Sequence, residues 1–176
     1  TADELDVRKG EVFYKNDPSK KMLVRDAVQF SRGPITGRST YQPIPGFERT
    51  AFAAQAAEIE VDTLTGSITV LKYVAAHDVG KAINPLGLEQ QIEGGVVMGL
   101  GAALTEELLI DQATGLPLND NILDYKALSI KDVPRTIDVI LVEHARAYGT
   151  YGAHGIGEPP INPPAAVIAN AVFNAI

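Results

Sequence analysis

Apolar and acidic residues alternate most clearly between residues 57 and 61, in Ala57-Glu-Ile-Glu-Val61. This period of two predicts a strand with one buried face and one solvated face. The β-branched stretch Ser67–Val74 predicts a second strand, and Asp62–Gly66 predicts the turn between them because it ends in glycine. We therefore expect an antiparallel hairpin in this part of the chain.

A second pattern has the helical period, with an apolar residue at every fourth position: Leu88, Ile92, Val96, Leu100 and Leu104. It predicts a helix over about residues 85–107, capped by Asn84 and begun by Pro85. The helix contains five glycines, Gly87, Gly94, Gly95, Gly99 and Gly101. Each interior glycine costs about 1 kcal/mol relative to alanine. Two explanations stay open and are compatible: close packing against another element, which is commoner, or close approach of a ligand near Gln91.

The N-terminal part carries weaker signals. Glu11–Tyr14 predicts a short strand and Asn16–Ser19 a turn. Ser19 is a candidate cap for a helix over roughly residues 20–31. The loop signals that follow suggest mostly irregular structure in this part.

The C-terminal half has three further predicted elements. Leu108–Ile110 and Leu116–Leu118 predict a second hairpin around a turn, and residues 136–142 predict another strand. Asn162 and Pro163 predict the cap and first residue of an alanine-rich terminal helix. Strands and helices do not alternate regularly, so we expect an α+β fold, or mixed α/β, built from antiparallel hairpins, the glycine-rich helix and the C-terminal helix.

Composition narrows the function classes. The 176 residues carry a net charge of −7 without a basic run, so we expect neither nucleic acid nor an anionic membrane as a partner. The absence of cysteine excludes disulfides, thiolate metal sites and cysteine nucleophiles within these residues. The three histidines lack the HExxH spacing and the aspartates around Asp111 lack the EF-hand spacing, so no metal site is predicted.

Targeting signals are not visible in the sequence. No apolar run approaches about 20 residues and no signal peptide is seen, so the expected location is the cytoplasm. The chain starts without methionine and stops inside a helical pattern. We expect a piece of a longer polypeptide, or a subunit that partners complete.

The strongest candidate for chemistry is Glu158, which lies among four glycines and four prolines in the stretch Gly149–Pro164. Glycine allows close approach to the backbone, and proline fixes φ. Because Pro159 follows Glu158, we expect an extended backbone at Glu158. The pattern predicts a carboxylate on a rigid arm, as a general base requires. The alternative is a surface turn with a solvated glutamate.

Other candidates are weaker. Gln91, near the start of the glycine-rich helix, can both donate and accept hydrogen bonds, but a solvated glutamine is the commoner case. His77 and Asp78 are interpreted as structural, because neighbours on a strand point to opposite faces. No serine lies in a nucleophile-elbow context, and no GxGxxG or Walker pattern is present.

Three blocks together carry a family resemblance: Asp78–Pro85, Gln91–Gly101 and Gly155–Pro160. In order and spacing they resemble the C-terminal part of the molybdenum-binding subunit in the xanthine dehydrogenase/aldehyde oxidase family. The resemblance runs from about residue 38 to the end. It suggests a division into an irregular connecting segment, residues 1–37, and the C-terminal portion of a molybdopterin-binding domain, residues 38–176.

The resemblance implies an oxidoreductase that uses molybdopterin, the molybdenum cofactor, and acts only within a larger heteromeric complex. Such a hydroxylase oxidises an electron-poor carbon of a small molecule with water-derived oxygen. By motif, Glu158 would be the catalytic general base, while Gln91 and Gly157 would contact the cofactor. The implied partners are the remainder of the molybdenum subunit and chains or domains with iron–sulfur clusters and FAD.

The resemblance leaves the substrate open among purines, aldehydes, N-heteroaromatics and acyl-CoA compounds. Met98 and His154 depart from the family pattern, which commonly has Gln and Lys at these positions, and Gln90 stands where Gly is common. A non-catalytic structural or assembly fragment without a complete site is the alternative function. A hydrolase with a second acidic residue opposite Glu158 is the third, and no clear candidate for that residue is present.

Overall fold

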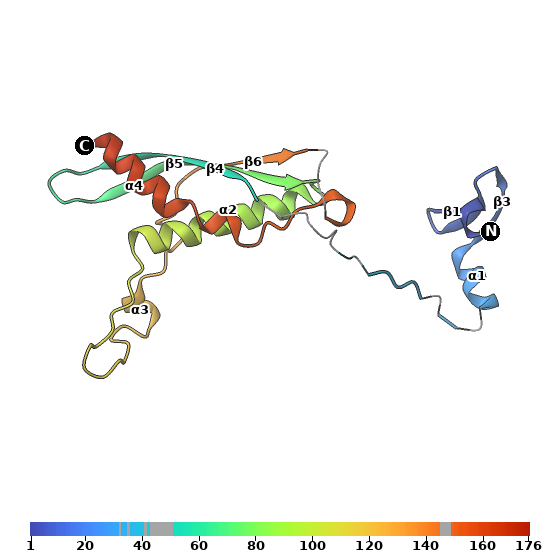
Figure 1. Ribbon diagram of the computed structural model, residues 1–176, viewed down its shortest axis with the longest axis horizontal. Coiled ribbons are helices and arrows are strands. Elements are labelled where there is room, and N and C mark those ends of the chain that lie inside the picture. Colours follow the sequence, from blue (N-terminus) through green and yellow to red (C-terminus); the bar gives the residue numbers. More distant parts are fainter. Residues whose placement is uncertain (32, 35, 41, 43–50, 145–148) are drawn as a thin grey trace. The chain divides into compact units, whose positions relative to one another are not determined.

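The computed structural model describes residues 1–176 except residues 32, 35, 41, 43–50 and 145–148 (Figure 1). The chain forms two compact units, Thr1–Gln42 and Pro43–Ile176. The division at residue 37 stays a prediction about the extent of the cofactor domain.

The first unit is a three-stranded antiparallel sheet with a short helix. Its elements are η1 (Ala2–Glu4), β1 (Leu5–Arg8), β2 (Glu11–Tyr14), β3 (Asp17–Leu23) and α1 (Val24–Phe30), with strand order β1-β2-β3. Lys9 and Gly10 both have positive φ, 52° and 80°, which suits the tight turn between β1 and β2. Part of the segment expected to be irregular therefore has regular structure.

The strand expected at Glu11–Tyr14 is confirmed, and the turn at Asn16–Ser19 is wrong. The helix expected over roughly residues 20–31 is confirmed for Val24–Phe30, but its predicted first turn is strand. Residues from Asp17 onward pair with β2 instead, as in the pair Phe13 and Lys21. Ser19 caps no helix, and its hydroxyl donates to Asp17. Cross-strand pairing overrides the weak helix signal, and α1 begins only at Val24.

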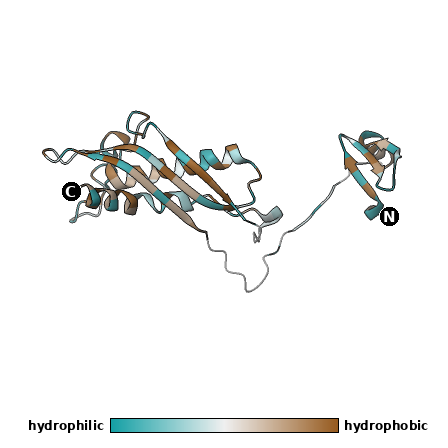
Figure 2. Ribbon diagram, turned by 90° about the horizontal axis from the view of Figure 1, so that it is seen from above, coloured by the Kyte–Doolittle hydropathy of each residue, from teal (hydrophilic) through white to brown (hydrophobic). Residues whose placement is uncertain are grey.

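The second unit is built on a sheet of three strands in the order β4-β5-β6: β4 (Ala53–Val61), β5 (Ile68–Gly80) and β6 (Ile137–Glu143). β4 and β5 form the expected antiparallel hairpin. Asp62 stabilises its turn by accepting from the Leu64 amide at 2.9 Å, and Gly66 has φ 76°. Hydrophobic and hydrophilic residues alternate along these strands (Figure 2). β6 is also confirmed as a strand, and it pairs parallel to β5.

The glycine-rich helix α2 (Pro85–Leu104) runs along one face of this sheet (Figure 1). The Asn84 side chain caps it by accepting from the Gly87 amide at 3.3 Å. Its predicted apolar stripe is the core: Ile92, Val96 and Leu100 are fully buried. They share one cluster with Tyr73, Ala75 and Val79 of β5, Ile156 of the glycine–proline stretch and Ile168 of α4. The helix is thus stabilised by burial rather than by intrinsic propensity.

Two of the helix glycines leave room for prolines that pack closely against α2. A Cβ on Gly95 would lie 2.6 Å from Cβ of Pro160, which belongs to η3 (Pro159–Ile161). A Cβ on Gly99 would lie 2.6 Å from Cγ of Pro164, the first residue of α4 (Pro164–Ala175). Close packing, the first explanation for these glycines, is therefore confirmed at both positions.

The remaining elements are short. Ile110 and Pro117 form a single bridge around the turn Asp111–Gly115, in place of a full second hairpin. Asn121 caps α3 (Ile122–Tyr125). The terminal helix begins at Pro164, with Pro163 rather than Asn162 in the cap position. The fold is α+β, as expected, and none of the described helices is both long and apolar enough to cross a membrane.

We predict that Gly95→Ala destabilises the protein by about 1–3 kcal/mol, because the added methyl group overpacks the contact with Pro160. Gly94→Ala is the matched control: its Cβ would meet nothing within 4 Å, so only the gain in helix propensity remains. Thermal or denaturant unfolding of the two variants measures the difference. Equal stability of both would contradict the packing described here.

Candidate functional site

A hollow of about 710 Å³ lies between α2 and the glycine–proline stretch. It is lined by Gln90, Gln91, Gly94, Gly95, Met98, Gly157, Glu158, Ile161 and Asn162. All three residues singled out from the sequence, Gln91, Gly157 and Glu158, are among them. Residues 66 positions apart in the chain thus meet at one surface.

Glu158 lies at the N-terminus of η3 with an exposed side chain. Its backbone is helical, with φ −101° and ψ −29°, so the expected extended conformation is wrong. The restriction before proline is a steric preference, and here the Ile161 amide donates to the Glu158 carbonyl at 3.0 Å and closes the turn. The burial of Pro160 against Gly95 holds the same turn in place.

Two glutamine side chains fix the backbone on either side of Glu158. The Gln91 amide donates to the Gly157 carbonyl at 2.9 Å, and the Gln55 amide donates to the Pro160 carbonyl at 3.2 Å. Gln91 belongs to α2 and Gln55 to β4. The carboxylate is therefore held on a frame that both the helix and the sheet support.

The hydrogen bonds of Gln55 also determine the state of His77. Because the Pro160 carbonyl can only accept, the atom facing it is the Gln55 amide nitrogen, and Gln55 Oε1 accepts from the Tyr73 hydroxyl at 2.7 Å. The same nitrogen lies 2.8 Å from His77 Nε2, which must therefore accept. His77 is neutral with its proton on Nδ1, in agreement with burial lowering its pKa.

The Nδ1 atom of His77 is buried and has no hydrogen-bond partner among the residues that the structure describes. Burial also raises the pKa of the Tyr73 hydroxyl, so it stays protonated and donates. Sequence reasoning missed Gln55. This residue of β4 binds Pro160, which lies 105 positions later in the chain, and the strand pattern carries no signal for such a distant contact.

The profile of a family described as "Molybdopterin cofactor-binding domain" matches residues 1–134. The chain belongs to this family. It is 40% identical over 122 residues to the putative xanthine dehydrogenase molybdenum-binding subunit XdhA of Escherichia coli K12, covering 69% of this chain and 16% of that protein. It is 30% identical to the 6-hydroxypseudooxynicotine dehydrogenase complex subunit gamma of Paenarthrobacter nicotinovorans, covering 99% of this chain and 23% of that protein.

Solved structures give the same result. Quinoline 2-oxidoreductase from Pseudomonas putida 86 superimposes with a TM-score of 0.78 at 26% identity, over 99% of this chain and 23% of that one. The aldehyde oxidoreductase from Desulfovibrio desulfuricans matches with a TM-score of 0.63 at 35% identity, over 70% of this chain and 13% of that one. The chain thus spans less than a quarter of the length of these relatives.

The residues of the hollow fit a molybdopterin group. A Cβ at Gly94 or Gly157 would meet nothing within 4 Å, and neither residue has positive φ. Among the residues that the structure describes, neither packing nor backbone conformation therefore requires glycine at these two positions. Their glycines leave the hollow wide and its backbone accessible, which suits a molybdopterin cofactor-binding domain.

A second polar group lies outside the hollow, at the ends of β5 and β6. Asp78 of β5 contacts His144, which follows β6, and His154 of the glycine–proline stretch. Burial raises the pKa of Asp78, but hydrogen bonds from Gly80 and His144 and the charge of the histidines outweigh it and hold the pKa below its ordinary value. The sequence interpretation considered Asp78 only with its neighbour His77, and the distant histidines went unrecognised.

We predict that Gln55→Leu destabilises the protein by about 1–3 kcal/mol, because the buried Tyr73 hydroxyl and His77 imidazole lose their shared partner. Gln90→Leu, at an exposed glutamine, is the control and should stay within about 0.5 kcal/mol of the parent. Denaturant unfolding measures both. If Gln55→Leu lowered the free energy of unfolding no more than the control does, the hydrogen bonds of Gln55 would not contribute to stability.

Proposed function

We propose that this chain supplies the catalytic base and part of the cofactor site of a molybdenum hydroxylase of the xanthine dehydrogenase/aldehyde oxidase type. The reaction would oxidise an electron-poor carbon of a purine, aldehyde or N-heteroaromatic compound with water-derived oxygen. The observation that carries the proposal is the hollow that Glu158 lines together with Gln91, Gly94 and Gly157.

Glu158 is suited to accept a proton. Glu158 lines the hollow with an exposed side chain, and none of the described residues donates a hydrogen bond to its carboxylate. A base must be ionised and able to reach the proton that it removes. The anchors at Gly157 and Pro160 limit how far this carboxylate moves, which lowers the entropy cost of bringing it to the reacting group.

Gln91 has a double role in this proposal. One amide N–H holds the Gly157 carbonyl, which leaves the second N–H and the carbonyl oxygen for polar groups of the pterin. Gly157 and Gly94 let the cofactor approach the backbone closely. When bound, the molybdenum cofactor supplies the acceptor for the two electrons that leave the substrate.

Further polypeptide should complete the site. The segment after α2 exposes a group of large apolar side chains, Leu108, Leu109, Ile110, Leu116, Leu118, Ile122 and Leu123. So many exposed apolar residues in one segment are typical of a surface that other polypeptide covers. We infer contact with the remainder of a molybdenum subunit, in an assembly whose iron–sulfur and FAD partners carry electrons away.

We predict that Glu158→Gln in the complete, molybdenum-loaded enzyme lowers the rate of the reductive half-reaction by at least about 10²-fold, because the amide cannot accept the proton. Folding and metal content should remain, since the Glu158 side chain is exposed and makes no hydrogen bond to the described residues. Glu158→Asp should also fail, because the anchored backbone cannot move to recover the lost methylene. Stopped-flow reduction by substrate measures the rate, and a wild-type rate in Glu158→Gln would rule out this base.

We predict that Gln91→Ala lowers both turnover and molybdenum occupancy, because it removes a cofactor contact and the anchor of Gly157 together, each worth about 1 kcal/mol. Glu89→Ala, on the exposed side of the same helix, is the control. Metal analysis and steady-state kinetics of the complete enzyme test this. Unchanged occupancy and turnover would make Gln91 an ordinary solvated residue.

A further inference from the structure

Asp78, His144 and His154, here called the Asp78 group, are residue types that commonly bind metal ions. One carboxylate and two imidazoles offer ligand atoms that all lie within 4.8 Å of one another, and among the described residues the group combines three separate segments of chain. His144 Nε2 lies 3.1 Å from Asp78 Oδ2, and His154 Nδ1 lies 3.3 Å from Asp78 Oδ1. The side chain of Asp78 is only 8% exposed.

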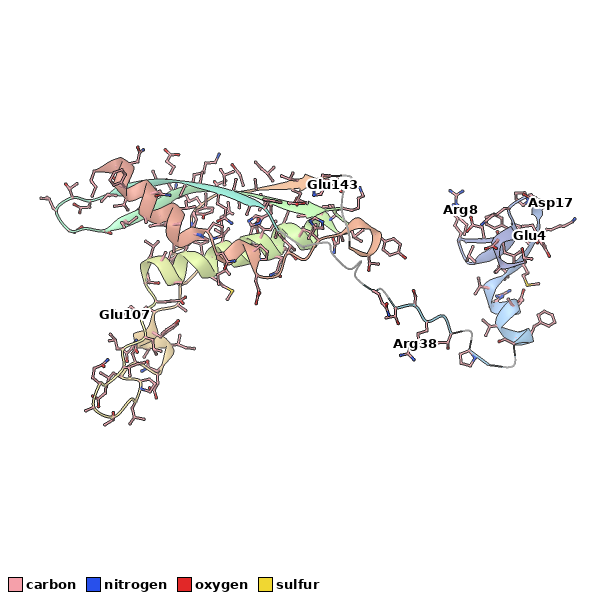
Figure 3. All side chains as sticks on the ribbon, in the orientation of Figure 1. Glu4, Arg8, Asp17, Arg38, Glu107 and Glu143 are labelled. Atoms are coloured by element: carbon pink, nitrogen blue, oxygen red, sulfur yellow. The ribbon has the colours of Figure 1, made fainter. Side chains whose placement is uncertain are left out.

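The backbone holds each of the three residues in place. The His154 amide donates to the Val79 carbonyl at 3.0 Å, and the His144 amide donates to the Gly80 carbonyl at 3.2 Å. The Gly80 amide in turn donates to Asp78 Oδ1 at 2.9 Å. Glu143, labelled in Figure 3 at the end of β6, accepts from the Ala82 amide at 2.8 Å and fixes the chain beyond β5. A ligand set ordered in this way costs little entropy when it binds an ion.

The spacing allows one ion to reach all three residues. Ligands at 2.0–2.1 Å from Zn²⁺ in a tetrahedral site lie about 3.3 Å from one another. Each imidazole nitrogen lies at about this separation from a different oxygen of Asp78, His144 at 3.1 Å from Oδ2 and His154 at 3.3 Å from Oδ1. The two rings have centroids 5.4 Å apart and planes inclined by 71°, so they approach the carboxylate without stacking on each other.

We propose that Asp78, His144 and His154 bind one divalent transition-metal ion, with Zn²⁺ as the best fit to two imidazoles and a carboxylate. The ion would clamp residues 149–157 to the ends of β5 and β6. His144 is 40% exposed, so water can reach a fourth position. The site shares no residue with the hollow and does not depend on the proposed function. It differs from the expectation from sequence, which predicted no metal site.

The competing explanation is a hydrogen-bonded group in which the imidazoles donate to Asp78 without an ion. Hydrogen bonds give similar distances, so the geometry must be tested with the metal itself. The probe is Zn²⁺ alone, added to the complete protein and followed by dialysis. Zinc per chain is then measured by elemental analysis, and zinc K-edge absorption reports its ligands separately from molybdenum and iron.

We expect one zinc ion per chain, with nitrogen and oxygen ligands at about 2.0–2.1 Å and the scattering of two imidazoles. His144→Ala and His154→Lys should each weaken zinc binding at least about 100-fold, because each removes one of three ligands. Asp138→Asn, which alters a surface ion pair with Lys72 on β5 and β6, is the control and should bind zinc like the parent.

Because the side chain of His144 is more exposed than that of His154, we expect His144→Ala to fold more readily than His154→Lys. Far-UV circular dichroism checks that each variant is folded. If the folded parent retains no zinc after dialysis, the group is a hydrogen-bonded cluster only and the proposal is wrong. Zinc binding by folded His144→Ala with unchanged affinity, or a zinc spectrum without imidazole ligands, would equally overturn it.

Discussion

The contact between Pro160 and Gly95 is the constraint on which the candidate site depends. Pro160 is buried against α2, and no side chain larger than hydrogen fits at Gly95 without displacing it. The contact brings η3 against the helix within two residues of Glu158. It explains why a long helix keeps glycines that weaken it locally: they allow the approach that brings the Gly157 carbonyl within a hydrogen bond of Gln91. The glycines lower the intrinsic stability of α2, and in return the turn at η3 has a defined position against the helix.

Directional bonds complete what this apolar contact begins. Packing alone fixes the distance between η3 and α2, whereas Gln91 and Gln55 fix the rotation of the carbonyls on both sides of Glu158. Gln55 further couples the site to the sheet, since its amide contacts both His77 and Pro160. Buried networks of this kind specify one arrangement, because any alternative leaves buried polar groups unpaired.

Local patterns in the sequence were sufficient for the hairpin of β4 and β5, for α2 with its buried stripe, and for Glu158 as a candidate. The family resemblance added Gly157 and a role for Gln91, and the three residues line one hollow. Local patterns failed where partners distant in the chain decide the outcome. β3 forms because it pairs with β2, and Glu158 is helical because Ile161 closes its turn. The Asp78 group needed the parallel pairing of β5 with β6, which brings His144 beside a strand end 66 positions earlier. The periodicity of hydrophobic residues within one segment does not show which distant segments pair with it.

The two histidines that sequence analysis missed bear on the charge requirement of Asp78. A carboxylate that is 8% exposed needs a compensating positive charge close by. The two imidazoles beside this carboxylate can meet that need as hydrogen-bond donors to Asp78 or as further ligands of a bound cation. In the proposed site the ion supplies the positive charge, and each imidazole adds a nitrogen ligand. The loop before Glu158 would then be held by an ion at His154 and by packing at Pro160, two restraints of different physical kind on either side of the same carboxylate.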